Sequence, residues 1–265
     1  MIYIESKDNN LFKYVKKLKE RKFRDKEGLF ILEGLRLVKE AIKANMEIKN
    51  IFISKSFEDK LVTEFNNTFL ENTIILNDNL FSQLASTENP QGVIAIVKKI
   101  NNNKDEIGDF YLICDKVQDP GNLGTIIRTA HAAGVNGIIL TKGTVDIYND
   151  KTIRSTMGSI FYIPIIYEDN DFTFIKKLKS EGFSLITTSL QESKNFFEEN
   201  LRGKVILAVG NEGNGIGDEL FDLADKKVKI PMPGDAESLN VAIAASIILF
   251  EKVRQGSLVE WRNNS

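Results

Sequence analysis

The pattern of hydrophobic and polar positions divides the chain into two halves of alternating strands and helices. Short β-prone apolar runs alternate with segments whose apolar residues recur at helical spacing, which is typical of α/β proteins. In the first half the pattern predicts a small α/β sandwich, with strands at 29–32, 48–53, 73–76 and 93–97 and helices at 35–44, 57–65 and 80–84. A polar stretch follows, so we predict domains over 1–98 and 109–265, joined by a linker over 99–108.

The second half contains strands that are hydrophobic along almost their whole length. Such strands are buried on both faces, as in a parallel sheet, so Cys114 is expected to be a small core residue. The side chains between 150 and 159 fit a substrate contact and a helix cap leading into a strand equally well. The elements expected here are strands at 110–115, 137–141, 160–166, 183–188, 205–209 and 228–232, and helices at 172–181 and at 125–133, the latter ended by Gly134.

The last predicted helix, 241–250 (VAIAASIILF), is apolar around its whole circumference, unlike a surface helix with one polar face. It is also too short to cross a bilayer, which takes about 20 residues. It must therefore be buried on every side, within its domain or against a partner subunit, and we favour the subunit contact. Charge returns at Glu251, and the residues beyond are expected to form a polar tail.

Composition narrows the possible chemistry. The 265 residues include one cysteine and one histidine, His131. These are too few for a Cys/His zinc site, a histidine-based triad or a CxxC redox pair, so we expect no metal. A single cysteine excludes an intrachain disulfide and indicates a reducing compartment. The first ten residues lack the apolar segment of a signal peptide, and without a membrane span the expected location is cytoplasmic.

The net charge is only −2, but residues 7–26 are strongly basic. Leu11, Val15 and Leu18 recur there at helical spacing, so we predict one amphipathic helix with a packed face and a cationic face. The cationic face fits a solvated helix surface and a surface that contacts nucleic-acid phosphates about equally well. The basic residues are Lys7, Lys13, Lys16, Lys17, Lys19, Arg21, Lys22, Arg24 and Lys26, against Asp8, Glu20 and Asp25.

Three loops of the second half follow strand ends, where α/β sheets bind their ligands. We therefore expect the loops after Ile113, Val209 and Ile230 to converge on one site. The second loop, 210–217 (GNEGNGIG), is rich in glycine, which lets the backbone approach a ligand closely. Its spacing matches neither the GxGxxG fingerprint nor the P-loop signature, which argues against a dinucleotide site and against a P-loop.

Three stretches resemble the motifs of the SpoU/TrmH RNA 2′-O-ribose methyltransferases of the SPOUT superfamily. They are DKVQDPGNLGTIIRTAHAAG (115–134), AVGNEGNGIG (208–217) and IPMPGDAESLNVAIAASIILFE (230–251). Earlier in the chain, LFILEGLRLVKEAI (29–42) and ASTENPQGVIAI (85–96) are similar to the L30e-like RNA-binding domain of the members that act on ribosomal RNA. The resemblance therefore accounts for both halves.

The resemblance implies an L30e-like α/β domain that binds RNA and a SPOUT α/β domain that contains a deep trefoil knot, binds S-adenosyl-L-methionine and forms an obligate homodimer. The residues alone would favour a Rossmann-like domain, because knots are rare. Ile216 and Ala242 depart from the residues common in the family, and neither departure indicates an inactive enzyme. The residues expected to contact the cofactor, largely through backbone groups, are Gly210, Ile230, Leu239, Thr188, Gly213 and Met232.

The motif positions that the resemblance identifies as catalytic are Arg128, Asn122, Glu212, Ser238 and Asn240. Because arginine stays protonated and is a poor base, we expect Arg128 to stabilise the ribose 2′-oxygen or to clamp the adjacent phosphate, from its own or the opposite subunit. The other four would hold Arg128, the ribose and the loops in place, although caps and loop hydrogen bonds would also explain them. His131 is expected to be packed rather than catalytic.

The function implied is 2′-O-methylation of a ribose in 23S ribosomal RNA. The added N-terminal domain favours ribosomal RNA, and transfer RNA is the alternative. Two other classes are a non-catalytic RNA-binding protein that retains the fold, which need not bind S-adenosylmethionine, and a nicotinamide-dependent oxidoreductase, which would bind NAD.

Overall fold

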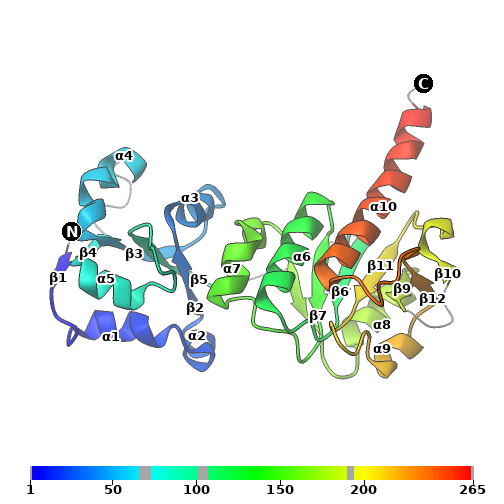
Figure 1. The fold of residues 1–265 in the computed structure, drawn as a ribbon, viewed down its shortest axis with the longest axis horizontal. Helices are drawn as coiled ribbons and strands as arrows, with labels where there is room; N and C mark the ends of the chain where they lie inside the picture. Colours follow the sequence, from blue (N-terminus) through cyan, green and yellow to red (C-terminus); the bar gives the residue numbers. More distant parts are fainter. Residues whose placement is uncertain (1, 66–72, 101–106, 190–193, 264–265) are drawn as a thin grey trace. The chain divides into compact units, whose positions relative to one another are not determined.

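The structure, a computed structural model, describes residues 2–65, 73–100, 107–189 and 194–263 (Figure 1). The chain forms two compact units. The first comprises Met1–Asn101 and Tyr148–Phe161, and the second comprises Asn102–Ile147 and Tyr162–Ser265. Most of the stretch expected to be a linker, 99–108, lies outside the described residues.

The first unit is built on a five-stranded mixed sheet in the order β1-β4-β3-β5-β2. β4 runs parallel to β1 and β3, whereas β5 is antiparallel to β3 and β2. The hydrophobic pattern predicts all of these strands except β1, whose three residues are too few to show a period. The strands are β1 (Ile2–Ile4), β2 (Leu29–Glu33), β3 (Ile48–Ser54), β4 (Thr73–Leu76) and β5 (Val93–Lys98).

Helices bury their apolar faces against this sheet. Phe12 of α1 and Phe81 of α5 pack in one cluster with Phe52 and Ile94 from the strands. The segment predicted as a helix at 57–65 begins as a 3₁₀ turn and becomes α-helical only from Leu61. The helical elements are α1 (Asn10–Lys17), α2 (Arg21–Glu27), α3 (Leu35–Lys43), η1 (Lys55–Lys60), α4 (Leu61–Phe65) and α5 (Asp78–Leu84).

The basic segment forms two helices, α1 and α2, so the prediction of one amphipathic helix was wrong. Arg24 stabilises the break between them. Its Nη1 atom donates hydrogen bonds to the carbonyl oxygens of Leu18, at 2.9 Å, and Lys19, at 2.6 Å, which satisfies carbonyl groups at the end of α1. Arg24 is consequently buried, whereas Lys16 and Lys22 are exposed.

Residues 148–161 pack within the first unit, although both neighbouring stretches of chain belong to the second. The ring centroids of Tyr148 and Phe30 are 4.7 Å apart, and the Tyr148 hydroxyl accepts a hydrogen bond from the Ile100 amide at 3.1 Å. α7 (Asp150–Thr156) contacts β2 and is capped by Asn149. The stretch therefore contains a capped helix, but the cap is Asn149 rather than a residue between 150 and 159.

The second unit contains a seven-stranded sheet in the order β10-β12-β9-β11-β6-β7-β8, and all of its pairings are parallel. This confirms the parallel sheet, and Cys114 is fully buried in it as predicted. The strands are β6 (Phe110–Cys114), β7 (Gly137–Leu140), β8 (Ile165–Tyr167), β9 (Ser184–Thr188), β10 (Lys194–Asn195), β11 (Val205–Val209) and β12 (Lys226–Lys229).

The two-residue strand β10 was not predicted, and two of the predicted strands have different bounds. The apolar run that begins at Ile160 first forms a 3₁₀ turn, η3 (Ser159–Phe161), and β8 begins only at Ile165. β12 ends at Lys229 because the prolines that follow cannot donate to a strand ladder. The loop with Ile230 and Met232 therefore starts directly at the carboxyl end of β12.

Helices cover both faces of the second sheet (Figure 1). α8 and α9 pack on the strand side chains of one face, including Ile113 and Ile206. α6 and α10 contact each other, and α10 contacts β11. The helical elements are α6 (Pro120–Ala132), α8 (Thr173–Ser180), η4 (Phe196–Glu198), α9 (Asp218–Asp222) and α10 (Val241–Asn263).

α6 begins at Pro120, earlier than the predicted start at Thr125. The Asp119 side chain accepts a hydrogen bond from the Asn122 amide at 2.8 Å, and proline suits the first helical position. Asn122 consequently lies in the first turn of the helix rather than in a loop before it. At the other end the helix stops before Gly134, as predicted.

α10 is longer than the predicted 241–250 and continues to Asn263, so the expectation of a polar tail was wrong. A buried polar anchor explains part of the extension. Gln255 accepts a hydrogen bond from the Leu201 amide at 2.9 Å and donates to the Glu199 carbonyl at 3.0 Å and to Glu251 at 2.9 Å. None of the helices in the described part of the chain has the length and apolarity needed to span a membrane.

The helix is also not buried all round within its own unit. Its inner face, with Ala245 and Leu249, is fully buried. Ile243 and Phe250 are 52% and 48% exposed, and their spacing of seven residues places them on the same side of the helix. The chain itself therefore leaves an apolar face of α10 uncovered.

Candidate active site

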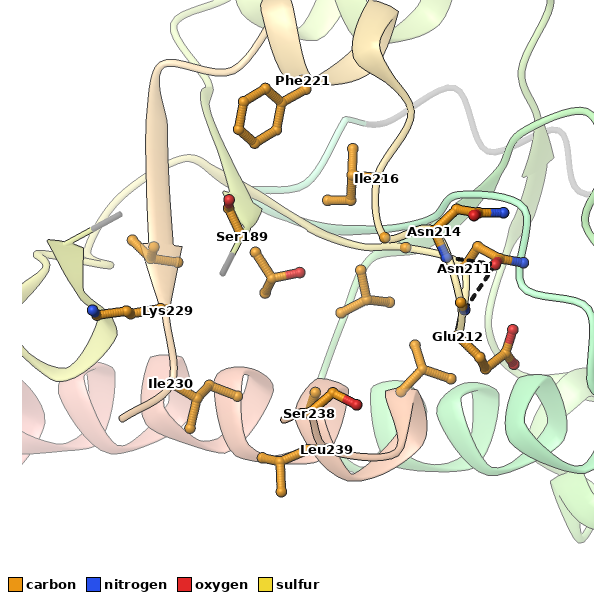
Figure 2. A pocket seen from close by; sticks show the side chains of 18 of the residues that line it. Ser189, Asn211, Glu212, Asn214, Ile216, Phe221, Lys229, Ile230, Ser238 and Leu239 are labelled. Carbon is orange, nitrogen blue, oxygen red and sulfur yellow. Dashed lines mark hydrogen bonds between the residues drawn. The ribbon is translucent and has the colours of Figure 1, made fainter. Parts of the chain in front are cut away.

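A pocket of about 640 Å³ lies at the carboxyl ends of β9, β11 and β12 (Figure 2). Ile216 and Phe221 line one side, and Ile230, Ser238 and Leu239 line the opposite side. The pocket thus joins the glycine-rich loop after β11, the start of α9, the loop after β12 and the first turn of α10. Such a position, beyond the carboxyl ends of parallel strands, is where α/β sheets bind ligands.

The glycine-rich loop is folded back tightly on itself. Asn211 and Gly215 exchange two backbone hydrogen bonds of 2.8 and 2.9 Å, with Gly215 at φ +70°. A Cβ atom on Gly210 would lie 2.2 Å from the Gly215 carbonyl carbon, so only glycine fits there. Gly210, Gly213 and Gly215 also line the pocket, and because glycine has no side chain a ligand can approach the backbone closely at these positions.

All six residues expected to contact a cofactor line this pocket. Their role in binding remains a prediction, but the fold brings them together from four separate stretches of chain. They are Thr188, Gly210, Gly213, Ile230, Met232 and Leu239.

Only two of the three loops expected to form the site line the pocket. The loop after Ile113 contributes no residue to the pocket lining and leads into α6 instead. Its place is taken by the end of β9, with Thr188 and Ser189. The loop after Ile113 instead joins the site through hydrogen bonds to Glu212.

A hydrogen-bond network connects three of the predicted polar residues. The Asn122 side-chain amide donates to Glu212 Oε1 at 3.0 Å, and the Asn240 amide donates to Asn122 Oδ1 at 3.0 Å. Asn240 Oδ1 also accepts from the Ala242 amide at 2.9 Å and so caps α10. The predicted capping role and the predicted site position therefore coincide in one side chain.

The network favours the ionised form of Glu212. Partial burial of its carboxylate opposes ionisation, but the hydrogen bonds from the Asn122 side chain and from backbone amides such as that of Gln118 outweigh burial, so the pKa of Glu212 is lowered from 4.5. Glu212 lines the pocket as an anion at neutral pH. Ser238 lies on the pocket wall as well.

Arg128 is exposed on α6 and does not line the pocket. It makes no hydrogen bond or ion pair within the described residues, so the expectation that Asn122, Glu212, Ser238 and Asn240 hold it directly is not met in a single chain. Its guanidinium group is thus available to a molecule outside the chain. His131, one turn further along α6, is exposed but stacks on Tyr162 with ring centroids 5.2 Å apart.

Sequence reasoning missed several residues that line the pocket. Ser189 does so from the residue after β9 and Asp218 and Phe221 from α9, and Asn211 organises the glycine loop. The signal for Asn211 is its position inside the glycine-rich stretch. α9 is too short for a helical period to reveal it. The described residues contain no group of three or more His, Cys, Asp and Glu side chains placed to hold a metal ion.

The protein belongs to the SpoU rRNA methylase family, whose model matches residues 109–250. Residues 9–95 match a second model, the MRM3-like substrate binding domain. The first match contains the pocket and the Asn122–Glu212 network, and the second contains α1, α2 and strands β2, β3 and β4 of the mixed sheet. The α/β fold class and the family resemblance are confirmed.

Individual relatives match along almost the whole chain. The 23S rRNA (guanosine(2553)-2′-O)-methyltransferase RlmP of Bacillus subtilis is 38% identical, over 94% of this chain and 98% of its own. An AdoMet-bound rRNA methyltransferase from Sinorhizobium meliloti superposes with a TM-score of 0.82 at 34% identity, over 95% of this chain and 97% of its own. The SpoU methyltransferase AviRb from Streptomyces viridochromogenes, in complex with AdoMet, has a TM-score of 0.83 at 28% identity, over 93% and 98%.

Proposed function

We propose that this protein methylates the 2′-hydroxyl of a ribose in 23S ribosomal RNA and takes the methyl group from S-adenosylmethionine. The observation that carries the proposal is the pocket beside the Glu212–Asn122–Asn240 network, in a chain similar along 94% of its length to a 23S rRNA 2′-O-methyltransferase. An RNA-binding protein without activity would not require this network, and the glycine loop lacks the spacing of a nicotinamide site.

The pocket fits the cofactor in size and in chemistry. Its apolar side chains, including Ile216, Phe221 and Ile230, suit a purine ring, and the backbone groups of the glycine loop suit the polar edges of a nucleoside. Bound S-adenosylmethionine supplies an activated methyl group. The protein then has to align a ribose hydroxyl with it and keep water out.

The chain's own side chains provide this alignment. Arg128 carries a permanent positive charge and can stabilise negative charge developing on the 2′-oxygen, or bind the adjacent phosphate. Asn122, fixed between Glu212 and Asn240, holds the first turn of α6 against the pocket loop. Ser238 is exposed on the pocket wall. Its hydroxyl is positioned to donate a hydrogen bond to the ribose or to accept one from it.

The substrate RNA is bound in part by the first unit. α1 and α2 present Lys16, Lys17 and Lys22, which are exposed and have no carboxylate partner within the described residues. Phosphate contacts supply much of the affinity of proteins for nucleic acids. The match of residues 9–95 to a substrate binding domain supports this role.

We also propose that two copies of the chain associate through α10 and that the second unit carries the trefoil knot of SPOUT proteins. The exposed Ile243 and Phe250 support the dimer, because a partner subunit would cover these two apolar side chains on one side of α10. A partner subunit could then bring its Arg128 to the pocket of this one. The likeness to SpoU methyltransferase structures supports the knot. A reducing cytoplasm, where ribosomal RNA is found, suits the buried thiol of Cys114.

The experiment that tests the function is methyl transfer from radiolabelled S-adenosylmethionine to ribosomal RNA and, separately, to transfer RNA, both from cells lacking this gene. Alkaline hydrolysis then locates the label. We expect label in an alkali-resistant dinucleotide from 23S rRNA, since 2′-O-methylation blocks cleavage at that ribose. Label only in transfer RNA would mean that transfer RNA is the substrate instead. The absence of label from naked RNA and from ribosomal precursor particles would refute the proposal.

A further inference from the structure

Asp115 follows directly after β6, and its carboxylate is buried at 2% exposure. It does not line the pocket. A buried carboxylate is stable only when hydrogen bonds satisfy it, so its partners indicate what it holds in place. Both of its oxygen atoms are used, and each has a partner from a different part of the sheet.

One oxygen binds the residue after the neighbouring strand, and the other binds the residue between the glycine loop and α9. The Thr141 hydroxyl, after β7, donates to Asp115 Oδ1 at 2.6 Å. The Gly217 amide donates to Asp115 Oδ2 at 2.7 Å. Gly217 is the joint between the glycine loop and α9, and its neighbours Ile216 and Asp218 both line the pocket. Asp115 therefore fixes the joint between two pocket walls.

The next residue, Lys116, anchors the other end of the same loop. Its carbonyl oxygen accepts a hydrogen bond from the Asn211 side chain at 3.0 Å, and Asn211 Oδ1 in turn accepts from the amides of Gly213 and Asn214 (Figure 2). Lys116 has φ +54°, a left-handed conformation that costs a non-glycine residue free energy. Its amide is held in this conformation by the Thr141 hydroxyl at 3.1 Å.

We infer that Asp115 and Thr141 are positioning residues for the active site. Asp115 and Lys116 form a platform that holds the loop 211–217 at both ends, and Thr141 fixes the platform to β7. The loop between these anchors carries Glu212, which binds Asn122. A shift of the platform would thus move the pocket wall and Glu212 together, although neither Asp115 nor Thr141 touches the pocket. The effect on catalysis rests on the proposed function, whereas the effect on the loop does not.

The variants that test this inference are Asp115→Asn, which keeps the shape but removes the charge, and Thr141→Val, which removes only the hydroxyl. Thr144→Val is the matched control, because the Thr144 hydroxyl also donates to the end of β6, at 3.1 Å, but to the Cys114 carbonyl rather than to Asp115. Hydrogen exchange of the full-length protein measures the loop, titration with S-adenosylhomocysteine measures the pocket, and steady-state kinetics separate the KM values of cofactor and RNA.

We expect faster exchange in peptides covering 210–222 for Asp115→Asn and Thr141→Val, with the peptides of β6 and β11 unchanged. S-adenosylhomocysteine should bind about tenfold more weakly to Asp115→Asn, the scale of one lost charge-assisted hydrogen bond, while KM for RNA stays the same. The double variant should be no worse than the worse single one, because both act through one platform. Thr144→Val should match the wild type.

Wild-type exchange and wild-type affinity in both variants would overturn the inference. So would faster exchange throughout the sheet, since that would mark a general loss of stability instead of a local role. If Asp115→Asn does not fold, Thr141→Val decides alone. A wild-type protein that neither binds S-adenosylhomocysteine nor methylates RNA would refute the proposed function, and exchange of 210–222 would still decide the role of Asp115.

Discussion

Asn122 occupies the centre of the candidate site, because its one side chain both donates and accepts. Its amide group binds Glu212 and its carbonyl oxygen receives Asn240. An aspartate of the same shape could accept from Asn240, but it would place a second carboxylate against Glu212. The amide is therefore the one group of this size that satisfies both neighbours, which explains why an uncharged residue stands here.

This pairing predicts a pH-dependent effect of Asn122→Ala. The pKa of Glu212 in the folded protein lies below 4.5, so its ionisation stabilises the protein at neutral pH, and that stabilisation is lost as the pH falls through the lowered pKa. The variant should be less stable than wild type by up to about 1 kcal/mol at pH 7, with the difference shrinking below pH 4.5. Urea unfolding across pH measures it. Asn214→Ala, a nearby exposed control, should show no such trend, and a difference that grows in acid would contradict the assignment.

Arg128 poses the opposite situation, a charged side chain with no partner in the described part of its own chain. If it acts on the ribose oxygen or the adjacent phosphate, Arg128→Ala should lower kcat by about 100-fold or more, while the Kd for S-adenosylhomocysteine stays near that of wild type. Arg128→Lys keeps the charge and should retain part of the activity. Single-turnover methylation and calorimetry provide the two readouts, and an unchanged kcat would remove Arg128 from the mechanism.

At the scale of elements, α1 and α2 form a cationic surface that we propose binds RNA. Two adjacent exposed lysines of α1, Lys16 and Lys17, allow this role to be tested. Replacing Lys16 and Lys17 by glutamate should weaken binding of a 23S rRNA fragment, and the slope of log K against log salt concentration should shrink by roughly 0.7 to 0.9 for each phosphate that the variant no longer binds. The matched control reverses Lys176 and Lys177 of α8, which are also exposed neighbours on a helix. Equal losses of affinity in the two variants, measured by filter binding, would show that net charge alone matters.

α10 gives a test of assembly that does not disturb the core. Ile243 is 52% exposed, so Ile243→Glu should leave the fold of each chain intact but place a charge in the proposed dimer contact. We expect a monomer by light scattering at concentrations where wild type is a dimer. Val62→Glu, at a position 53% exposed in the first unit, is the control. A dimeric Ile243→Glu variant would place the contact elsewhere.

At the scale of the whole molecule, the sequence predicted what depends on local pattern. Continuous apolar runs such as 110–114 and 205–209 indicated a parallel sheet, and loops after strand ends indicated the pocket. The position of Asn122 within α6 was missed because Gly121 and Gly124 favour a turn in the sequence. In the structure the Asp119 cap starts the helix before them. The length of α10 depends on Gln255 reaching the backbone of a distant segment, which no periodicity encodes.

In the candidate site, too, local pattern predicts some features and only tertiary contacts determine others. Five of the six pocket residues lie in the motifs 208–217 and 230–251, and Thr188 lies at the end of a predicted strand, but the connections among them are made by tertiary structure. Glu212 meets Asn122 only because β11 lies beside β6 in register, with Val209 opposite Cys114. The role of Asp115 was missed for that reason. It is the first residue of the motif 115–134, but the sequence does not show that its carboxylate binds Gly217 of another loop.

The placement of residues 148–161 has a practical consequence for dividing the protein. Because this segment leaves the second unit, folds into the first and returns, the polypeptide passes from one unit to the other three times. A fragment starting at residue 109 would retain the segment without β2, which α7 contacts, and would expose Ile153 of α7, which is 1% exposed in the intact chain. The two units are therefore not separate, consecutive segments of the chain that a single cut could divide. A soluble, isolated catalytic fragment would require a short polar bridge in place of residues 148–161.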